Sequence, residues 1–206
     1  MQAFGVLGRS LKDLWEELFL VIGLSLLWWL AVILLVGGPP ATVALTTIGY
    51  RLGRKQRVNL DFARETFKEN FWISWRLGLF AAAGAIVIAG NIYFYLQQSG
   101  SWLQVLTFVF LYLALALLTV LLYAFPFVQA MTPATALGAL RNAAIIAFAN
   151  PLFSLILLLG MGVLTAVAIA LPILAVLLLP GLLGIISGRA LANRLDAAEI
   201  RRSQQE

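Results

Sequence analysis

A basic cluster is the first feature of this chain that suggests chemistry. Arg51, Arg54, Lys55 and Arg57 follow an uncharged segment that turns at Gly37-Gly38-Pro39-Pro40. Such a cluster at a membrane face binds anionic lipid headgroups, with each basic residue contributing roughly 1 kcal/mol. The excess of Lys and Arg on cytoplasmic loops of membrane proteins explains the same cluster without any ligand. Both interpretations stay open, and both place the cluster beside a membrane.

The residue types used in most catalytic sites are scarce. The chain has no Cys and no His, which removes thiolate nucleophiles, histidine acid/base catalysis and the usual transition-metal ligands. Its nine carboxylates all lie outside the long apolar segments, and no glycine-rich phosphate-binding loop precedes a Lys and a Ser or Thr. We therefore expect a protein that is not an enzyme and that binds no cofactor and no metal.

Three residues inside the apolar segments are candidates for lining a cavity. Trp28 and Trp29 lie near the middle of the first segment, away from the interfaces that Trp prefers, and Asn91 lies in the second. Packing between helices is the ordinary explanation of the two Trp residues. The alternative is a path for a neutral solute between helices.

Long uncharged segments supply the elements that position these residues. Of the 206 residues, 62% are hydrophobic and 11% charged, and the mean hydropathy is +0.97. A segment of about 19 residues covers about 28 Å as a helix, close to the hydrocarbon thickness of a bilayer. We predict an all-α polytopic membrane helix bundle in a single domain, 1–206, with about five transmembrane helices. The predicted spans are 18–36, 77–95, 103–125 (ended by Pro126), 151–170 and 172–188 (kinked at Pro180-Gly181).

Amphipathic segments connect the predicted spans. Residues 1–17 have the pattern of an interfacial helix, 39–76 and 126–150 are predicted cytoplasmic elbows, and 189–206 form a polar tail. In the first elbow the spacing predicts a surface helix with one apolar face and one charged face. The apolar face carries Leu60, Ala63, Phe67 and Phe71, and the charged face carries Asp61, Arg64, Glu65, Lys68 and Glu69.

Sequence similarity between the elbows suggests an internal repeat. Pro40-Ala41-Thr42-Val43-Ala44-Leu45 resembles Pro133-Ala134-Thr135-Ala136-Leu137. Leu60, Ala63 and Asn70 have the spacing of Leu140, Ala143 and Asn150. The hypothesis is two parallel repeats of span, elbow and span, closed by a final helix. The matched segments are short and rich in Ala, so chance similarity is the alternative.

The distribution of basic residues predicts the orientation. The segment 51–76 is rich in Lys and Arg, whereas the turns near residues 99 and 171 have none, so the elbows and the C-terminus are expected in the cytoplasm. Five spans then put the N-terminus outside, although Arg9 and Lys12 favour the inside. The net charge of +5 follows from the same bias. We expect no nucleic-acid partner, because no aromatic-basic binding module is present.

Several motifs together resemble the YesL-like family of bacterial integral membrane proteins. They are Gly-Gly-Pro-Pro-Ala-Thr-Val-Ala-Leu after a Leu-Leu-Trp-Trp span, Asp-Phe-Ala-Arg-Glu-Thr-Phe-Lys-Glu-Asn-Phe, and Tyr-Ala-Phe-Pro-Phe before the second elbow. The resemblance implies a multi-pass protein of the bacterial cytoplasmic membrane with an accessory role in solute uptake. It brings no catalytic residues.

These features together predict a non-enzymatic membrane accessory or scaffold protein that assists the uptake of carbohydrate or another solute. Its expected partners are anionic headgroups on the cytoplasmic side and a membrane protein such as a transporter component. The alternative is a small permease for a neutral solute, with its path near Trp28, Trp29 and Asn91.

Overall fold

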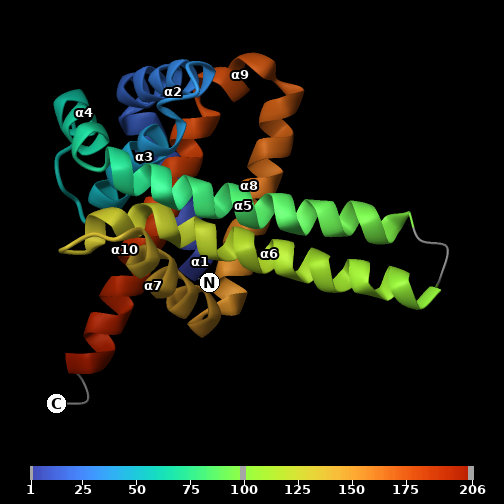
Figure 1. Cartoon of the computed structure of the whole chain (residues 1–206). Coiled ribbons are helices and arrows are strands. Elements are labelled where there is room, and N and C mark those ends of the chain that lie inside the picture. Colours follow the sequence, from blue (N-terminus) through green and yellow to red (C-terminus); the bar gives the residue numbers. More distant parts are fainter. Residues whose placement is uncertain (1, 98–100, 204–206) are drawn as a thin grey trace.

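The computed structural model describes residues 2–97 and 101–203, and this part of the chain contains ten helices and no strand (Figure 1). The all-α prediction is therefore confirmed. The last three residues of the predicted tail, 204–206, lie outside the described residues. The helices are α1 (Gln2–Glu16), α2 (Leu18–Ile33), α3 (Gly38–Gly53), α4 (Leu60–Glu69), α5 (Phe71–Leu96), α6 (Ser101–Ala130), α7 (Ala136–Ala149), α8 (Pro151–Ala170), α9 (Pro172–Leu177) and α10 (Leu179–Ser203).

Local sequence signals set several helix ends. Proline residues in the first turns of α3 and α8 cost no hydrogen bond, because the first amides of a helix have no partner inside it. Asn59 and Thr135 cap α4 and α7, accepting hydrogen bonds from the amides of Phe62 (2.9 Å) and Gly138 (3.2 Å). Asn150 precedes α8 as expected, but its side chain does not cap that helix.

Helix α3 is the centre of the fold, and residues 43–49 are buried along its whole middle. Its most extensive partner is α10, which approaches closely through Gly184 and Gly188. A Cβ atom on Gly188 would lie 2.1 Å from the carbonyl oxygen of Thr46, and one on Gly49 would lie 2.5 Å from that of Gly184. The Gly184-x-x-x-Gly188 motif is thus a helix-packing motif.

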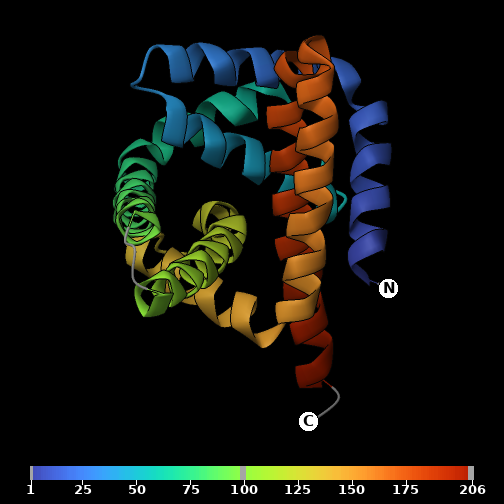
Figure 2. The same cartoon turned by 90° about the vertical axis from the view of Figure 1, so that its right-hand side faces the viewer.

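Two groups of helices extend from this centre in different directions. Helices α5 and α6 pack side by side and project as a two-helix arm (Figure 1). Seen along that arm, α1, α8 and α10 run side by side and α2 lies across one end (Figure 2). No charged residue occurs between Arg76 and Arg141, so the arm is uncharged beyond Arg76, which lies in the first turns of α5.

Three helices are long and apolar enough to span a membrane: Phe71–Leu96, Leu103–Ala130 and Pro151–Ala170. A fourth is present only if α1 and α2, bent by 95° relative to each other, are counted as one broken span. The predicted count of five is therefore not confirmed. The predicted span 18–36 is a helix of 16 residues, or about 24 Å, and the predicted span 172–188 is divided between α9 and α10.

Two proline predictions need correction. Pro126 does not end the third span, since α6 continues through it to Ala130. The predicted kink at Pro180-Gly181 is a full break that comes earlier, at Leu178, and α10 then runs through the predicted tail to Ser203. At both prolines, side chains from other helices form hydrogen bonds with backbone groups that the proline leaves without a partner in its own helix, as described below.

The repeat hypothesis stays a prediction, and the two elbows agree only in part. Thr42 lies inside α3, whereas Thr135 precedes α7, so the first half of the sequence match has different conformations. The second half is similar: Ser74 donates to the carbonyl oxygen of Asn70 (2.6 Å), and Ser154 donates to that of Asn150 (3.0 Å).

Helix α1 has one face buried in the protein and a second face with exposed apolar side chains. Ala3, Val6, Ser10 and Leu14 are buried where α1 packs on α8 and α10. Phe4, Leu11 and Trp15 are exposed.

Candidate functional site

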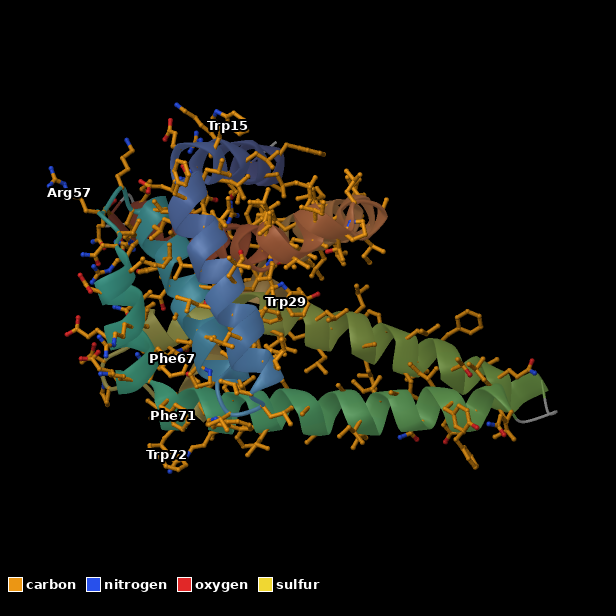
Figure 3. All side chains as sticks on the ribbon, turned by 90° about the horizontal axis from the view of Figure 1, so that it is seen from above. Trp15, Trp29, Arg57, Phe67, Phe71 and Trp72 are labelled. Carbon is orange, nitrogen blue, oxygen red and sulfur yellow. The ribbon has the colours of Figure 1, made fainter. Side chains whose placement is uncertain are left out.

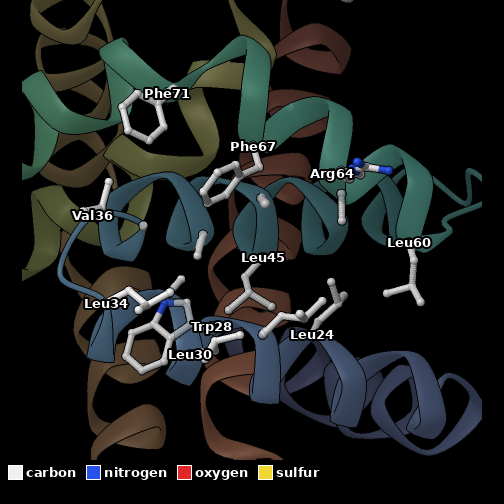
Figure 4. A pocket seen from close by; sticks show the side chains of 16 residues that line it. Leu24, Trp28, Leu30, Leu34, Val36, Leu45, Leu60, Arg64, Phe67 and Phe71 are labelled. Atoms are coloured by element: carbon white, nitrogen blue, oxygen red, sulfur yellow. The ribbon is translucent and has the colours of Figure 1, made fainter.

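An apolar cavity lies between α2 and α4, with α3 as its floor; we call it the α2–α4 groove (Figure 4). Its volume is about 420 Å³, and a single charged side chain, Arg64, is among its lining residues. The groove is lined by Leu24, Leu27, Trp28, Leu30, Ala31, Leu34, Val36, Gly37, Ala41, Ala44, Leu45, Leu60, Ala63, Arg64, Phe67 and Phe71.

A second apolar cavity of about 350 Å³ lies on the other side of Trp28, among α2, α3, α6, α8 and α10. Both Trp28 and Trp29 line it, together with the hydroxyl residues Thr42, Thr46 and Ser187. Each of the three hydroxyls donates a hydrogen bond to a backbone carbonyl oxygen. The lining therefore has few free polar groups for a sugar-like solute.

The two Trp residues both line a cavity and hold neighbouring helices together. The indole N–H of Trp28 donates to the hydroxyl of Thr42 (2.9 Å), and that of Trp29 donates to the carbonyl oxygen of Val176 (3.1 Å). Val176 is four residues before Pro180, which has no amide to offer it. Ser25 accepts the amide of Gly181 (3.1 Å), so α2 satisfies both sides of the break between α9 and α10.

Asn91 is not brought to the Trp residues. It lies on α5, outside the linings of both apolar cavities, and its side chain donates to the carbonyl oxygen of Val87 (2.8 Å). This is a bond to the preceding turn of its own helix, and it engages an amide N–H that a solute would need.

The basic cluster is divided in the structure. Arg54 pairs with Asp196 (3.2 Å) and Glu199 (3.4 Å) of α10, and the Arg51 guanidinium lies 3.4 Å from the centre of the Phe62 ring. Burial acts to lower the pKa of Arg54, but Tyr50 and the two carboxylates raise it overall. Lys55 and Arg57 are exposed in the turn before α4. Two of the four predicted lipid contacts are thus engaged within the protein.

A polar hollow of about 440 Å³ lies on the other side of α4. Its lining includes Arg51 and Arg57 together with the carboxylates Asp61 and Glu65. Because both signs of charge are present, the hollow has no strong preference for an anion.

Several polar contacts that hold the helices together were not predicted. Arg189 of α10 pairs with Asp13 of α1, and burial raises the pKa of Asp13 in spite of the attraction of Arg189. The Arg194 guanidinium lies 3.7 Å from the centre of the Phe153 ring and donates to the side-chain oxygen of Asn150 (3.2 Å). These pairs join positions more than 40 residues apart, so no local pattern could indicate them.

Arg64 lies on a different face of α4 from the predicted one. The prediction is the charged face, but Arg64 lines the α2–α4 groove with Leu60, Ala63 and Phe67 (Figure 4). The helical period indicates this face, because position 64 lies four residues after Leu60 and three before Phe67, and residues with these spacings share one face of a helix.

The fold and these cavities define a membrane-embedded, all-helical protein. Three to four apolar helices are long enough to span a bilayer, and within the described residues no three carboxylates come together as a metal site. Residues 21–92, which contain the whole α2–α4 groove, match the model of a family described as "Protein of unknown function, DUF624". The resemblance to the YesL-like family is consistent with this match. No curated protein and no solved structure matches the chain.

Proposed function

We propose that this chain is a non-enzymatic accessory or scaffold protein of a bacterial cytoplasmic membrane, which assists the uptake of carbohydrate or another solute by binding a membrane transporter component. The observation that carries the proposal is the concentration of charge on one part of the molecule. Polar atoms of the side chains gather along α4 and around Arg57, and few are seen along the arm (Figure 3).

The charged side chains outside the arm differ in what they contact. Arg54 and Arg189 pair with carboxylates of other helices and so stabilise the packing of α1, α3 and α10. In contrast, Glu65, Lys68 and Glu69 on α4 are exposed and make no ion pair with any described residue. Their charges are available to a partner, and charge complementarity at such a surface favours specific association.

The orientation in our proposal differs from the one expected from five spans. Asp13 of α1 contacts Arg189 of α10, and Asp196 of α10 contacts Arg54 of the first elbow. These contacts support one side of the membrane for the N-terminal helix, the first elbow and the C-terminal end of α10. This arrangement requires α9 and the apolar first part of α10 to return the chain across the membrane after α8. We assign that side to the cytoplasm because it carries the basic residues.

The permease alternative gains little from the geometry. Asn91 is separate from the Trp cavity, and the hydroxyl groups of that cavity are engaged with the backbone. A neutral, polar solute needs free donors and acceptors along its path to replace water.

The test is photo-cross-linking in cells, followed by identification of the adducts. A photoreactive amino acid replaces Lys68 on α4, and a matched control replaces Phe108, which is 70% exposed on the arm. We expect a discrete protein adduct from position 68 that includes a transporter component, and lipid adducts from position 108. Absence of a protein adduct at position 68, or solute uptake by proteoliposomes of this protein alone, would contradict the accessory function.

A further inference from the structure

The α2–α4 groove has the shape of a site for one hydrocarbon chain. Ala41 and Ala44 of α3 form its floor, and these small side chains leave space between the larger residues of α2 and α4. From Leu24 to Leu34 the groove follows α2 for about 15 Å. Its volume of about 420 Å³ lies within the range of about 300–1,000 Å³ typical of small-molecule sites.

The interior of the groove offers almost no polar group. Trp28 is the one lining residue besides Arg64 with a polar side-chain atom, and its N–H is already bonded to Thr42. A polar ligand would lose its hydrogen bonds to water there without replacement, whereas a hydrocarbon chain loses none. The lining therefore selects a ligand that is largely apolar.

The edge of the groove on α2 is apolar and accessible. Leu27 and Leu30 are each 54% exposed, and Leu34 is 63% exposed. In a chain with apolar helices long enough to span a bilayer, such an edge has lipid as its natural neighbour. A chain of a membrane lipid can thus enter the groove without crossing a polar barrier.

The edge on α4 carries a positive charge. Arg64 lies on this edge between Leu60 and Phe67 (Figure 4). It is exposed, and it forms no ion pair or hydrogen bond with any described residue. The carboxylates Asp61 and Glu65 line the polar hollow on the other side of the helix. Helix α4 therefore presents a positive charge to the groove and mixed charges to the hollow.

From this geometry we infer that the α2–α4 groove binds one acyl chain of an anionic phospholipid, and that the lipid phosphate pairs with Arg64. An arginine forms two parallel hydrogen bonds with a phosphate, which fixes the headgroup at the edge of the groove. The predicted lipid cluster of Arg51, Arg54, Lys55 and Arg57 is a different site. Arg64 differs from those residues in having an apolar groove beside its charge.

The test uses phosphatidylglycerol with a photoreactive diazirine on one acyl chain, added to the purified full chain in mixed micelles. Native mass spectrometry measures the lipid retained, and peptide mapping locates the adducts. We expect adducts within residues 24–34 and 60–67. Arg64→Gln should lower the retained lipid on the order of fivefold, as expected from the loss of one basic contact at a lipid surface. Arg57→Gln removes the same charge from the polar hollow and should leave retention within about twofold of the parent protein.

Two further probes separate the headgroup from the chain. Phosphatidylcholine carries the same phosphate, but its choline cation competes with Arg64 for that phosphate. The parent protein should therefore retain phosphatidylcholine with the same labelled chain less than phosphatidylglycerol, and it should retain photoreactive oleate less as well. The proposal is overturned if adducts map outside the groove, if Arg57→Gln matters more than Arg64→Gln, or if phosphatidylcholine or oleate is retained as well as phosphatidylglycerol. Adduct mapping is independent of any substitution, so the test does not depend on how well a variant folds.

Discussion

Ser187 of α10 donates a hydrogen bond of 2.5 Å to the carbonyl oxygen of Leu122 in α6. Leu122 is four residues before Pro126, so this carbonyl has lost the amide that a regular helix would provide. Where water is excluded, an unsatisfied carbonyl costs several kcal/mol. The bond from Ser187 therefore explains why α6 continues through Pro126, where the sequence predicts an end.

The first prediction tests this relationship with two substitutions. Ser187→Ala should destabilise the protein by about 1–3 kcal/mol, because it leaves the Leu122 carbonyl without a donor. In a Pro126→Ala background the amide of residue 126 becomes available, and the same substitution should cost clearly less. Unfolding in detergent micelles measures both, with Ser203→Ala on the exposed end of α10 as the control. Equal costs in the two backgrounds would disprove the coupling.

The second prediction concerns the break between α9 and α10. Trp29→Phe keeps an aromatic ring but removes the N–H that satisfies Val176, and should cost about 1 kcal/mol of stability. Ser25→Ala removes the acceptor of the buried Gly181 amide and should cost about 1–3 kcal/mol. The matched control is Trp72→Phe, because Trp72 is 75% exposed. Thermal unfolding of the three variants gives the comparison, and a loss at Trp72 as large as at Trp29 would contradict this role for Trp29.

The third prediction uses the glycines where α3 crosses α10. A Cβ on Gly188 would meet the carbonyl oxygen of Thr46 at 2.1 Å and the amide nitrogen of Tyr50 at 2.2 Å. Backbone atoms cannot move aside without separating the helices, so Gly188→Ala should destabilise the protein by about 3 kcal/mol, the upper end of the usual cost of overpacking. Gly90→Ala on α5 has nothing within 4 Å of the new atom and should be neutral or slightly stabilising. Size-exclusion chromatography after heating measures the stability of both variants. A Gly188→Ala variant as stable as the parent protein would refute the close crossing of α3 and α10.

The fourth prediction tests the proposed orientation. The chain has no Cys, so single cysteines can be placed without removing native ones. We expect Arg9→Cys, Lys55→Cys and Ser203→Cys to be protected from a membrane-impermeant maleimide in intact cells. Gln97→Cys, at the end of the arm, should react. Labelling after permeabilisation is the control for access. Reaction of Arg9→Cys in intact cells would restore the orientation with the N-terminus outside.

The local pattern of the sequence determined the helices and their chemistry. Uncharged segments about as long as a bilayer span and prolines in first turns act within a few residues, so α8 follows from the sequence with its observed ends. The predicted span 77–95 lies within α5, and the predicted elbows contain α4 and α7. The absence of Cys and His limited the chemistry in the same way. The correct face of Arg64 was also available from the helical period.

Tertiary structure alone decided the features that join distant positions. Ser187 and Leu122 are 65 residues apart, and Trp29 and Val176 are 147 apart. Whether a proline ends a helix depends on such partners, because the freed carbonyl needs a donor that only packing can supply. The groove follows the same principle: by sequence α2 is apolar and α4 has one apolar face, but the floor of small residues on α3 creates the space between them. The sequence by itself thus specifies membrane helices and a charged elbow, and packing determines where a ligand can bind.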